Sequence, residues 1–208
     1  NAFVDRGFAA RLGDGALTAL EYADRTRVIP EALVGAGLLR VTFTYWANAH
    51  AYGRIEDIQG SFARIAGWIW TLLVPCAATL LLLRHPVVNL LYGGAAFGAD
   101  SVRLTADTLA GYLPGVPIVM VGLLALQVLW IQGALRLVAI MGVVSAISHF
   151  LWNFMLLEPF GAPGLAASTS INQGLVAIVF LAVLSQRVEG VFGAKSLGKG
   201  LLYGGGVS

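Results

Sequence analysis

The sequence predicts an all-α, polytopic membrane protein: a transmembrane helix bundle of about five full spans with partial helices at both ends. Of its 208 residues, 58% are hydrophobic and only 12% are charged, whereas about a quarter would be charged in a soluble domain. Apolar runs of about 20 residues recur, which is the length that crosses a bilayer as a helix. The net charge of +2 is scattered, which argues against nucleic acid as a partner.

The first predicted helix covers residues 16–49 and follows a turn signal, Gly13-Asp14-Gly15. Its apolar part, residues 28–47, is long enough to span a bilayer, and Pro30 is expected to kink it. Residues 1–12 are interpreted as the tail of a preceding helix. Because the last residues form an apolar run that has only begun, we expect the chain to be part of a longer membrane protein.

Four further spans are predicted, separated by connections that are polar or rich in proline and glycine. Residues 50–61 are expected to form a surface connection, with a short helix lying at the membrane interface as the alternative, and residues 84–105 a connection that contains a short helix. The next span contains Pro114 and Pro117, which membrane helices tolerate where neighbours satisfy the freed backbone groups. The small-residue run 164–174 predicts close helix contact. The four spans cover residues 64–84, 106–131, 137–157 and 164–186.

The Lys and Arg residues favour one orientation of these spans. The connection after the first span, the turn before residue 137 and the tail after the last span hold more of them than the opposite side, so we expect the first set to be cytoplasmic. The two sets are Arg54, Arg64, Arg136, Arg187, Lys195 and Lys199, against Arg6, Arg11, Arg84 and Arg103.

No catalytic or metal-binding pattern occurs in the sequence, so we predict no enzyme activity and no cofactor. His149 and Asn153 lie one helical turn apart, and we interpret them as a polar pair that holds helices together, in preference to a proton relay. Cys76 lies within an apolar run and is predicted to be a small buried hydrophobic residue.

Six charged side chains occupy the segment from Glu21 to Arg40, in or beside the first span. A charged residue at the centre of a membrane helix costs roughly 2.5–3.5 kcal/mol, so such residues usually pair or face a wet cavity. Glu21 and Arg25 are four residues apart, Asp24 and Arg27 three, and Arg27 and Glu31 four, so the spacing allows three pairs. Ordinary solvated pairs above the bilayer are the alternative, and Arg40 is placed to extend towards the far interface.

Arg25 is the strongest candidate for a binding residue in this segment. A guanidinium that faces a cavity binds phosphate-containing headgroups as a bidentate donor. Arg25 is expected to hold such a group in one conformation and to release it in another.

Three segments match a pattern known from membrane transporters: DRGFAARLGDGALTALEYADRTRVIP, LLYGGAAFGADSVRLTADTLAGYLPGVP and GAPGLAASTSINQGLVAIVFLAVL. The most specific parts are Tyr22-Ala23-Asp24-Arg25 with the following Pro30, and Gly94-Ala95-Ala96-Phe97. Over nearly its whole length the chain resembles the second half of the MurJ/MviN family, the lipid II flippases of the multidrug/oligosaccharidyl-lipid/polysaccharide exporter superfamily.

This resemblance implies a fourteen-helix protein with two lobes around a cationic cavity, in which residues 1–208 form the C-terminal lobe and the N-terminal lobe is its partner. It implies that Arg25 lines the cavity, and Arg6, Asp24 and Arg27 are assigned there with it. The implied activity is alternating-access flipping of lipid II, a lipid-linked anionic peptidoglycan precursor, across the bacterial cytoplasmic (inner) membrane, in contact with membrane lipid and without covalent chemistry.

Other functions stay open at this point. Export of another polyprenyl-linked oligosaccharide is compatible with the same fold. A membrane glycan ligase would need a long outer loop with carboxylates, and no connection here exceeds about twenty residues. A non-transporting scaffold would be favoured if the polar face of the first helix were buried against protein.

Overall fold

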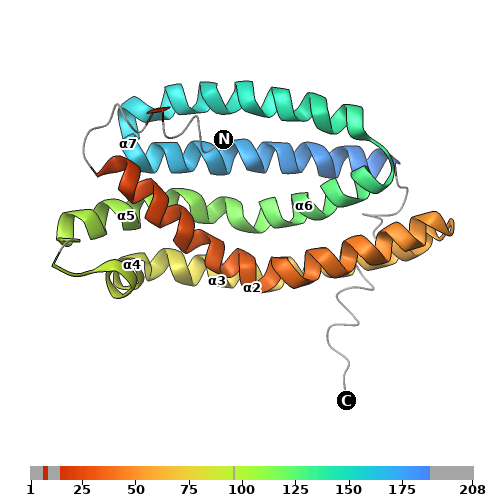
Figure 1. Ribbon diagram of the computed structural model, residues 1–208, viewed down its shortest axis with the longest axis horizontal. Coiled ribbons are helices and arrows are strands. Elements are labelled where there is room, and N and C mark those ends of the chain that lie inside the picture. The colour runs from red at the N-terminus through yellow and green to blue at the C-terminus, as the bar shows by residue number, and fades with distance from the viewer. Residues whose placement is uncertain (1–6, 9–14, 96, 188–208) are drawn as a thin grey trace, which may run out of the picture.

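The computed structural model describes residues 7–8, 15–95 and 97–187, with the side chains at 33, 34 and 36 left out of the description. The described residues are almost entirely helical, which confirms the all-α prediction. Figure 1 shows the helices side by side along the long axis of the molecule. The two arms of α7 form one side, α5 and α6 lie next to them, and α2 and α3 form the other side.

Helix α2 spans Ala16–Ala51 and carries the charged segment. It starts after Gly15, whose φ of 94° lies in the left-handed region that glycine adopts without strain. Its parts Ala16–Ala32 and Gly37–Ala51 are bent by 54° relative to each other. The bend follows Pro30, which removes one backbone hydrogen bond from the helix, as the predicted kink requires.

Helix α3 spans Ile55–Leu82, so the connection predicted over residues 50–61 ends at Arg54, and the residues after it are helical but continuous with the following span. The polar residues there form its first turns, because Glu56 and Asp57 are stabilised by the positive end of the helix dipole. Helix α4, Arg84–Tyr92, is the short helix expected within residues 84–105.

Helices α5 (Ala99–Tyr112) and α6 (Val116–Ile131) form one long element that is broken by the short 3-10 helix η1 (Leu113–Gly115). The break coincides with the two prolines of the predicted span. The element begins at Ala99, whereas the predicted span begins at residue 106. The prediction started too late because the first turns of α5 are amphipathic and low in hydropathy. The buried residues of α5 begin only at Thr105 and Ala106, so hydropathy does not mark the turns before them.

Helix α7, Leu135–Arg187, consists of two arms that run back along each other (Figure 1). The reversal occurs at Gly161, which has φ 59° and ψ −135° and lies between Pro159 and Pro163. The two arms correspond to the predicted spans 137–157 and 164–186.

The small-residue run 164–174 provides the close contacts that the sequence predicts. A Cβ atom added at Gly111 would lie 2.7 Å from the Pro163 carbonyl oxygen, and one at Gly115 would lie 2.9 Å from Ser170 Cβ. Ser170 Oγ also donates to the carbonyl oxygens of Gly111 (2.8 Å) and Tyr112 (2.9 Å). These contacts fix the second arm of α7 against the break between α5 and α6.

Three helical stretches in the described residues are long and apolar enough to cross a membrane, and the bent α2 counts as a fourth if its two parts form one span. The chain is therefore a multi-pass membrane protein. Cys76 is exposed on α3, so the prediction that it is buried is wrong. The reason is that a lipid-facing side is as apolar as a protein-facing side, and hydropathy does not separate the two.

Candidate functional site

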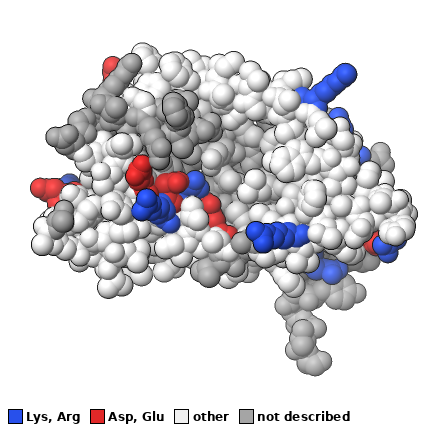
Figure 2. Space-filling model, viewed as in Figure 1, with Lys and Arg blue, Asp and Glu red and all other residues white. Residues whose placement is uncertain are grey.

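The candidate site is the α2 charge cluster, which we define as Asp24, Arg25, Arg27 and Glu31. Figure 2 shows acidic and basic side chains gathered in one place on a face that is otherwise nearly uncharged, where α2 crosses the molecule. Within the cluster, Arg27 Nε donates to Asp24 Oδ1 at 2.8 Å, and Arg27 Nη1 donates to Glu31 Oε1 at 2.6 Å. Two of the three pairs that the sequence spacing allows, Asp24–Arg27 and Arg27–Glu31, are thus confirmed.

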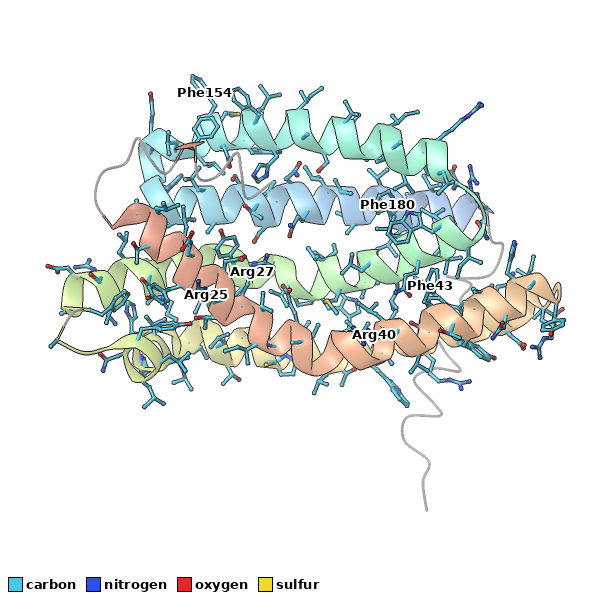
Figure 3. All side chains as sticks on the ribbon, viewed as in Figure 1. Arg25, Arg27, Arg40, Phe43, Phe154 and Phe180 are labelled. Carbon is cyan, nitrogen blue, oxygen red and sulfur yellow. The ribbon has the colours of Figure 1, made fainter. Side chains whose placement is uncertain are left out.

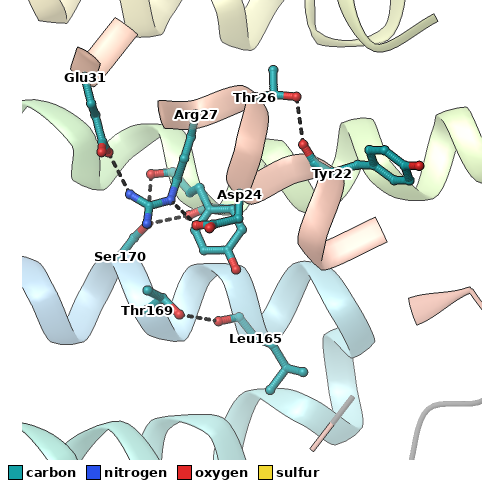
Figure 4. A network of polar contacts seen from close by, with 10 residues as sticks. Tyr22, Asp24, Thr26, Arg27, Glu31, Leu165, Thr169 and Ser170 are labelled. Carbon is teal, nitrogen blue, oxygen red and sulfur yellow. Dashed lines mark hydrogen bonds and ion pairs between the residues drawn. The ribbon is translucent and has the colours of Figure 1, made fainter. Parts of the chain in front are cut away.

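Arg27 is the central member of this cluster (Figure 4). Its side chain is only 16% exposed and that of Glu31 19%, whereas the Asp24 side chain is 49% exposed. The guanidinium also lies 5.1 Å from the ring centroid of Tyr112, at the end of α5. Two carboxylates and an aromatic face therefore neutralise and fix Arg27, which joins α2 to the break between α5 and α6.

Arg25 occupies a different environment on the same helix (Figure 3). Its side chain is exposed, and its guanidinium lies 5.7 Å from the ring centroid of Tyr22. An exposed guanidinium keeps N–H donors for a ligand, whereas those of Arg27 Nε and Nη1 are already used. The structure therefore separates two arginines that look alike in the sequence.

An aromatic cluster supports the first half of α2. The ring of Tyr22 lies 4.5 Å from that of Tyr92 and 5.4 Å from that of Phe97. The hydroxyl groups of Thr26 and Tyr92 share a hydrogen bond of 3.1 Å. The two specific motifs of the sequence, around Tyr22 and around Phe97, thus meet in space, and the connection after α4 is held against the charged helix.

Polar side chains inside the bundle hold helices together. His149 and Asn153 are fully buried on the first arm of α7, and Ser168 Oγ on the second arm donates to Asn153 Oδ1. Between the same arms, Asn172 Nδ2 donates to Ser145 Oγ at 2.9 Å. Asn153 thus has the helix-joining role that was expected for it and His149. The described residues contain no group of three or more His, Cys, Asp or Glu side chains placed to hold a metal ion.

Sequence reasoning missed two residues that position α2. Tyr112 gives no local sign of its contact with Arg27. Gln127 Nε2 donates to the Leu39 carbonyl oxygen at 3.0 Å, and a lone glutamine in an apolar helix is a signal that suggests such a bond. Among the predicted site residues, Arg6 lies outside the described ranges, and Arg40 is exposed on the second part of α2.

Removing Arg27 is expected to destabilise the bundle. In Arg27→Gln, Asp24 and Glu31 would face each other as like charges in a half-buried place, which we expect to cost about 2 kcal/mol. The measurement is the thermal unfolding midpoint of the purified full-length protein in detergent. The double variant Arg27→Gln/Glu31→Gln should recover part of the loss, and equal midpoints for all three proteins would contradict the pairing.

A family model described as lipid II flippase MurJ matches residues 1–201. A protein of Rickettsia prowazekii (strain Madrid E), named as a probable lipid II flippase, is 22% identical over 183 residues, which cover 85% of this chain and 35% of the relative. A lipid II flippase of Burkholderia cenocepacia is 26% identical over 192 residues, which cover 88% of this chain and 36% of the relative. The chain thus spans about a third of the length of these relatives.

The fold is also similar to that of a solved structure, a lipid II flippase in its inward closed conformation. The TM-score is 0.73 at 18% sequence identity, and the match covers 96% of this chain and 42% of that one. The two therefore share a fold over nearly all of this chain.

Proposed function

This chain belongs to the lipid II flippase MurJ family, and we propose that it forms one lobe of a transporter that moves lipid II across the bacterial inner membrane. The observation that carries this proposal is the family match over residues 1–201. The partner lobe is the N-terminal half of the same protein, and the transport cavity lies between the two lobes. The substrate crosses by alternating access, and no bond in it is made or broken.

Within this function, Arg25 is the residue that we assign to the substrate. The headgroup of lipid II is attached through a pyrophosphate, and an exposed guanidinium binds such a group through charge-assisted, bidentate hydrogen bonds. The exposure of Arg25 supports this role. Asp24 beside it would repel the phosphates, and Arg27, which is shared between Asp24 and Glu31, offsets part of that repulsion. Arg27 therefore acts as a positioning residue that makes the Arg25 surface more favourable to an anion.

Growth rescue tests the proposed function. The full-length gene is expected to restore growth of a bacterium that is depleted of its own lipid II flippase, and lipid II should become accessible at the outer face of the membrane. Failure to rescue by protein that is inserted in the membrane, under conditions where the resident gene does rescue, would contradict lipid II transport. Rescue of the export of another polyprenyl-linked saccharide alone would reassign the substrate.

A further inference from the structure

The described part of the bundle is packed around two hydrophobic cores. One core joins α6 to the second part of α2 and the first part of α3, and its members include Trp46, Phe62, Leu73, Val116 and Phe180. The other core joins α5 to α4, the first part of α2 and the reversal of α7, and its members include Ala23, Val88, Leu109, Leu113 and Leu165. We call these two parts of the bundle the α6 unit and the α5 unit.

The long element formed by α5, η1 and α6 is broken where the two units meet. Leu113 belongs to the core of the α5 unit and Val116 to that of the α6 unit, so η1 lies on the boundary. Pro114 and Pro117 have no backbone N–H to donate there, which interrupts the helix. We call this level of the bundle the waist.

Helix α2 bends at the same level (Figure 1). The bend between Ala32 and Gly37 separates a part that packs in the α5 unit from a part that packs in the α6 unit. A Cβ atom added at Gly35 would overlap the side chain of Met120, in the second turn of α6. The bend therefore lies directly against the start of α6.

Helix α3 also has a proline at the waist. Leu73 is in the core of the α6 unit, and Leu80 packs against the core of the α5 unit. Pro75 lies between them along α3, and it lines one outward groove together with Pro30 of α2. The prolines of α2 and α3 are thus neighbours in space.

Two polar contacts attach the two parts of α2 to different units. Before the bend, the guanidinium of Arg27 lies 5.1 Å from the ring centroid of Tyr112, which belongs to the core of the α5 unit. After the bend, Gln127 Nε2 on α6 donates to the Leu39 carbonyl oxygen at 3.0 Å. Each part of α2 is therefore expected to follow the unit that holds it.

Two helical glycines at the waist are not required by packing. A Cβ atom added at Gly37 would meet nothing within 4 Å among the described residues, and one at Gly174 would lie 3.6 Å from Ile118 Cγ2, an ordinary contact. The second contact also places Gly174, on the second arm of α7, beside the first turn of α6. Glycine lowers helix stability relative to alanine, so these two residues make α2 and α7 less stiff without any gain in packing.

We propose that the waist is a hinge about which the α5 unit tilts relative to the α6 unit while each core stays packed. Packed cores deform little, and motion is concentrated where helices are interrupted between them. The tilt changes the angle of α2 at its bend and moves the first part of α2, which carries the α2 charge cluster. The use of this hinge in moving a substrate rests on the proposed function.

Distances between pairs of spin labels test the hinge. The labels are attached to introduced cysteines in the full-length protein, after Cys76 and any other native cysteine have been replaced, and double electron–electron resonance is recorded in lipid nanodiscs. The pair at Leu17 and Thr44 spans the waist on α2, whereas the pair at Leu17 and Leu90 lies within the α5 unit and the pair at Thr44 and Leu135 within the α6 unit. All four positions are exposed. We expect a broad distance distribution across the waist and narrow distributions within each unit.

The variant Gly37→Ala/Gly174→Ala should narrow the distribution across the waist towards the width found within the units. A straight α2 would place residues 17 and 44 about 40 Å apart, roughly 4 Å further than the 54° bend does, so the mean distance should also increase by up to that amount. The unfolding midpoint should not fall, because alanine fits at both positions.

Gly67→Ala/Gly142→Ala is the matched control. Both glycines are exposed on helices of the α6 unit, and a Cβ atom at either would meet nothing within 4 Å, so the gain in helix propensity is similar but lies away from the waist. Equal narrowing in the two double variants would overturn the proposal, as would a distribution across the waist that is as narrow in wild type as those within the units. If Gly37→Ala/Gly174→Ala does not fold, Gly37→Ala alone should narrow the distribution, and no change would count against the hinge.

Growth rescue separates the hinge from the proposed function. Where wild type rescues a flippase-depleted bacterium, Gly37→Ala/Gly174→Ala should rescue less well than Gly67→Ala/Gly142→Ala at equal amounts of inserted protein. Equal rescue by the two double variants would overturn the use of the hinge in transport. Failure of wild type to rescue would contradict the proposed function, and the measured distances would still decide whether the waist is a hinge.

Discussion

Arg25→Ala in the full-length protein is expected to abolish rescue of a flippase-depleted bacterium while the protein is still made and inserted. The physical reason is that the variant removes an exposed guanidinium, and with it one or two charge-assisted bonds to a phosphate. Such bonds contribute about 1.5–3 kcal/mol each, which corresponds to roughly 10- to 100-fold in affinity. The measurement is growth rescue together with the amount of lipid II at the outer face.

Arg40→Ala is the control for this experiment, because Arg40 is also exposed on α2 but lies beyond the bend. It should rescue growth like wild type. Arg25→Lys should rescue partially, since an ammonium keeps the charge but not the planar pair of donors. Full rescue by Arg25→Ala would show that this arginine is not needed for the substrate, and would favour a structural role for the α2 charge cluster.

Gly122→Val is expected to prevent correct packing of the bundle. A Cβ atom added at Gly122 would overlap the Ala177 side chain and lie 2.8 Å from Ala177 Cα, so backbone would have to move. Both residues are in the contact between α6 and the second arm of α7. We expect a loss of about 3 kcal/mol, seen as a large decrease in monodisperse protein after solubilisation and in the unfolding midpoint.

Gly142→Val separates this effect from the difference in helix propensity between glycine and valine. Gly142 lies on the exposed side of the first arm of α7, and a Cβ atom there meets nothing within 4 Å. Its yield and unfolding midpoint should stay close to those of wild type. A Gly122→Val protein as stable as Gly142→Val would mean that the two helices are not as close as the structure has them.

The local features of the fold are predictable from the sequence. The apolar runs and the two proline breaks are properties of neighbouring residues, as are the turn at residues 158–163 and the Asp24–Arg27–Glu31 pairs. Segments that combine polar residues with helical structure are predicted less well. The first turns of α3 and α5 were expected to belong to connections, because their hydropathy is as low as that of a loop. The sequence alone does not show which side of a short amphipathic turn is buried.

The candidate site shows the same division. The sequence identifies the charged segment of α2 and the spacing of its pairs, but it does not separate Arg25 from Arg27. That difference depends on which side of α2 faces α5, where Tyr112 lies against Arg27, whereas Arg25 is exposed. Rotation of a helix about its own axis is set by its neighbours, and the sequence of one helix carries little information about it.

By itself, the sequence determined that this chain is a helical membrane protein and that six of its charged residues lie within one segment, Glu21 to Arg40. These follow from hydropathy and from spacing along a single helix. Only the tertiary structure decided that Arg27 is held and Arg25 is exposed, that the Tyr22 and Phe97 motifs meet, and that Cys76 is exposed on α3. The physical reason is that lipid and protein interior are equally apolar, so contacts between helices leave little trace in hydropathy and depend on shape, small residues and a few polar bonds.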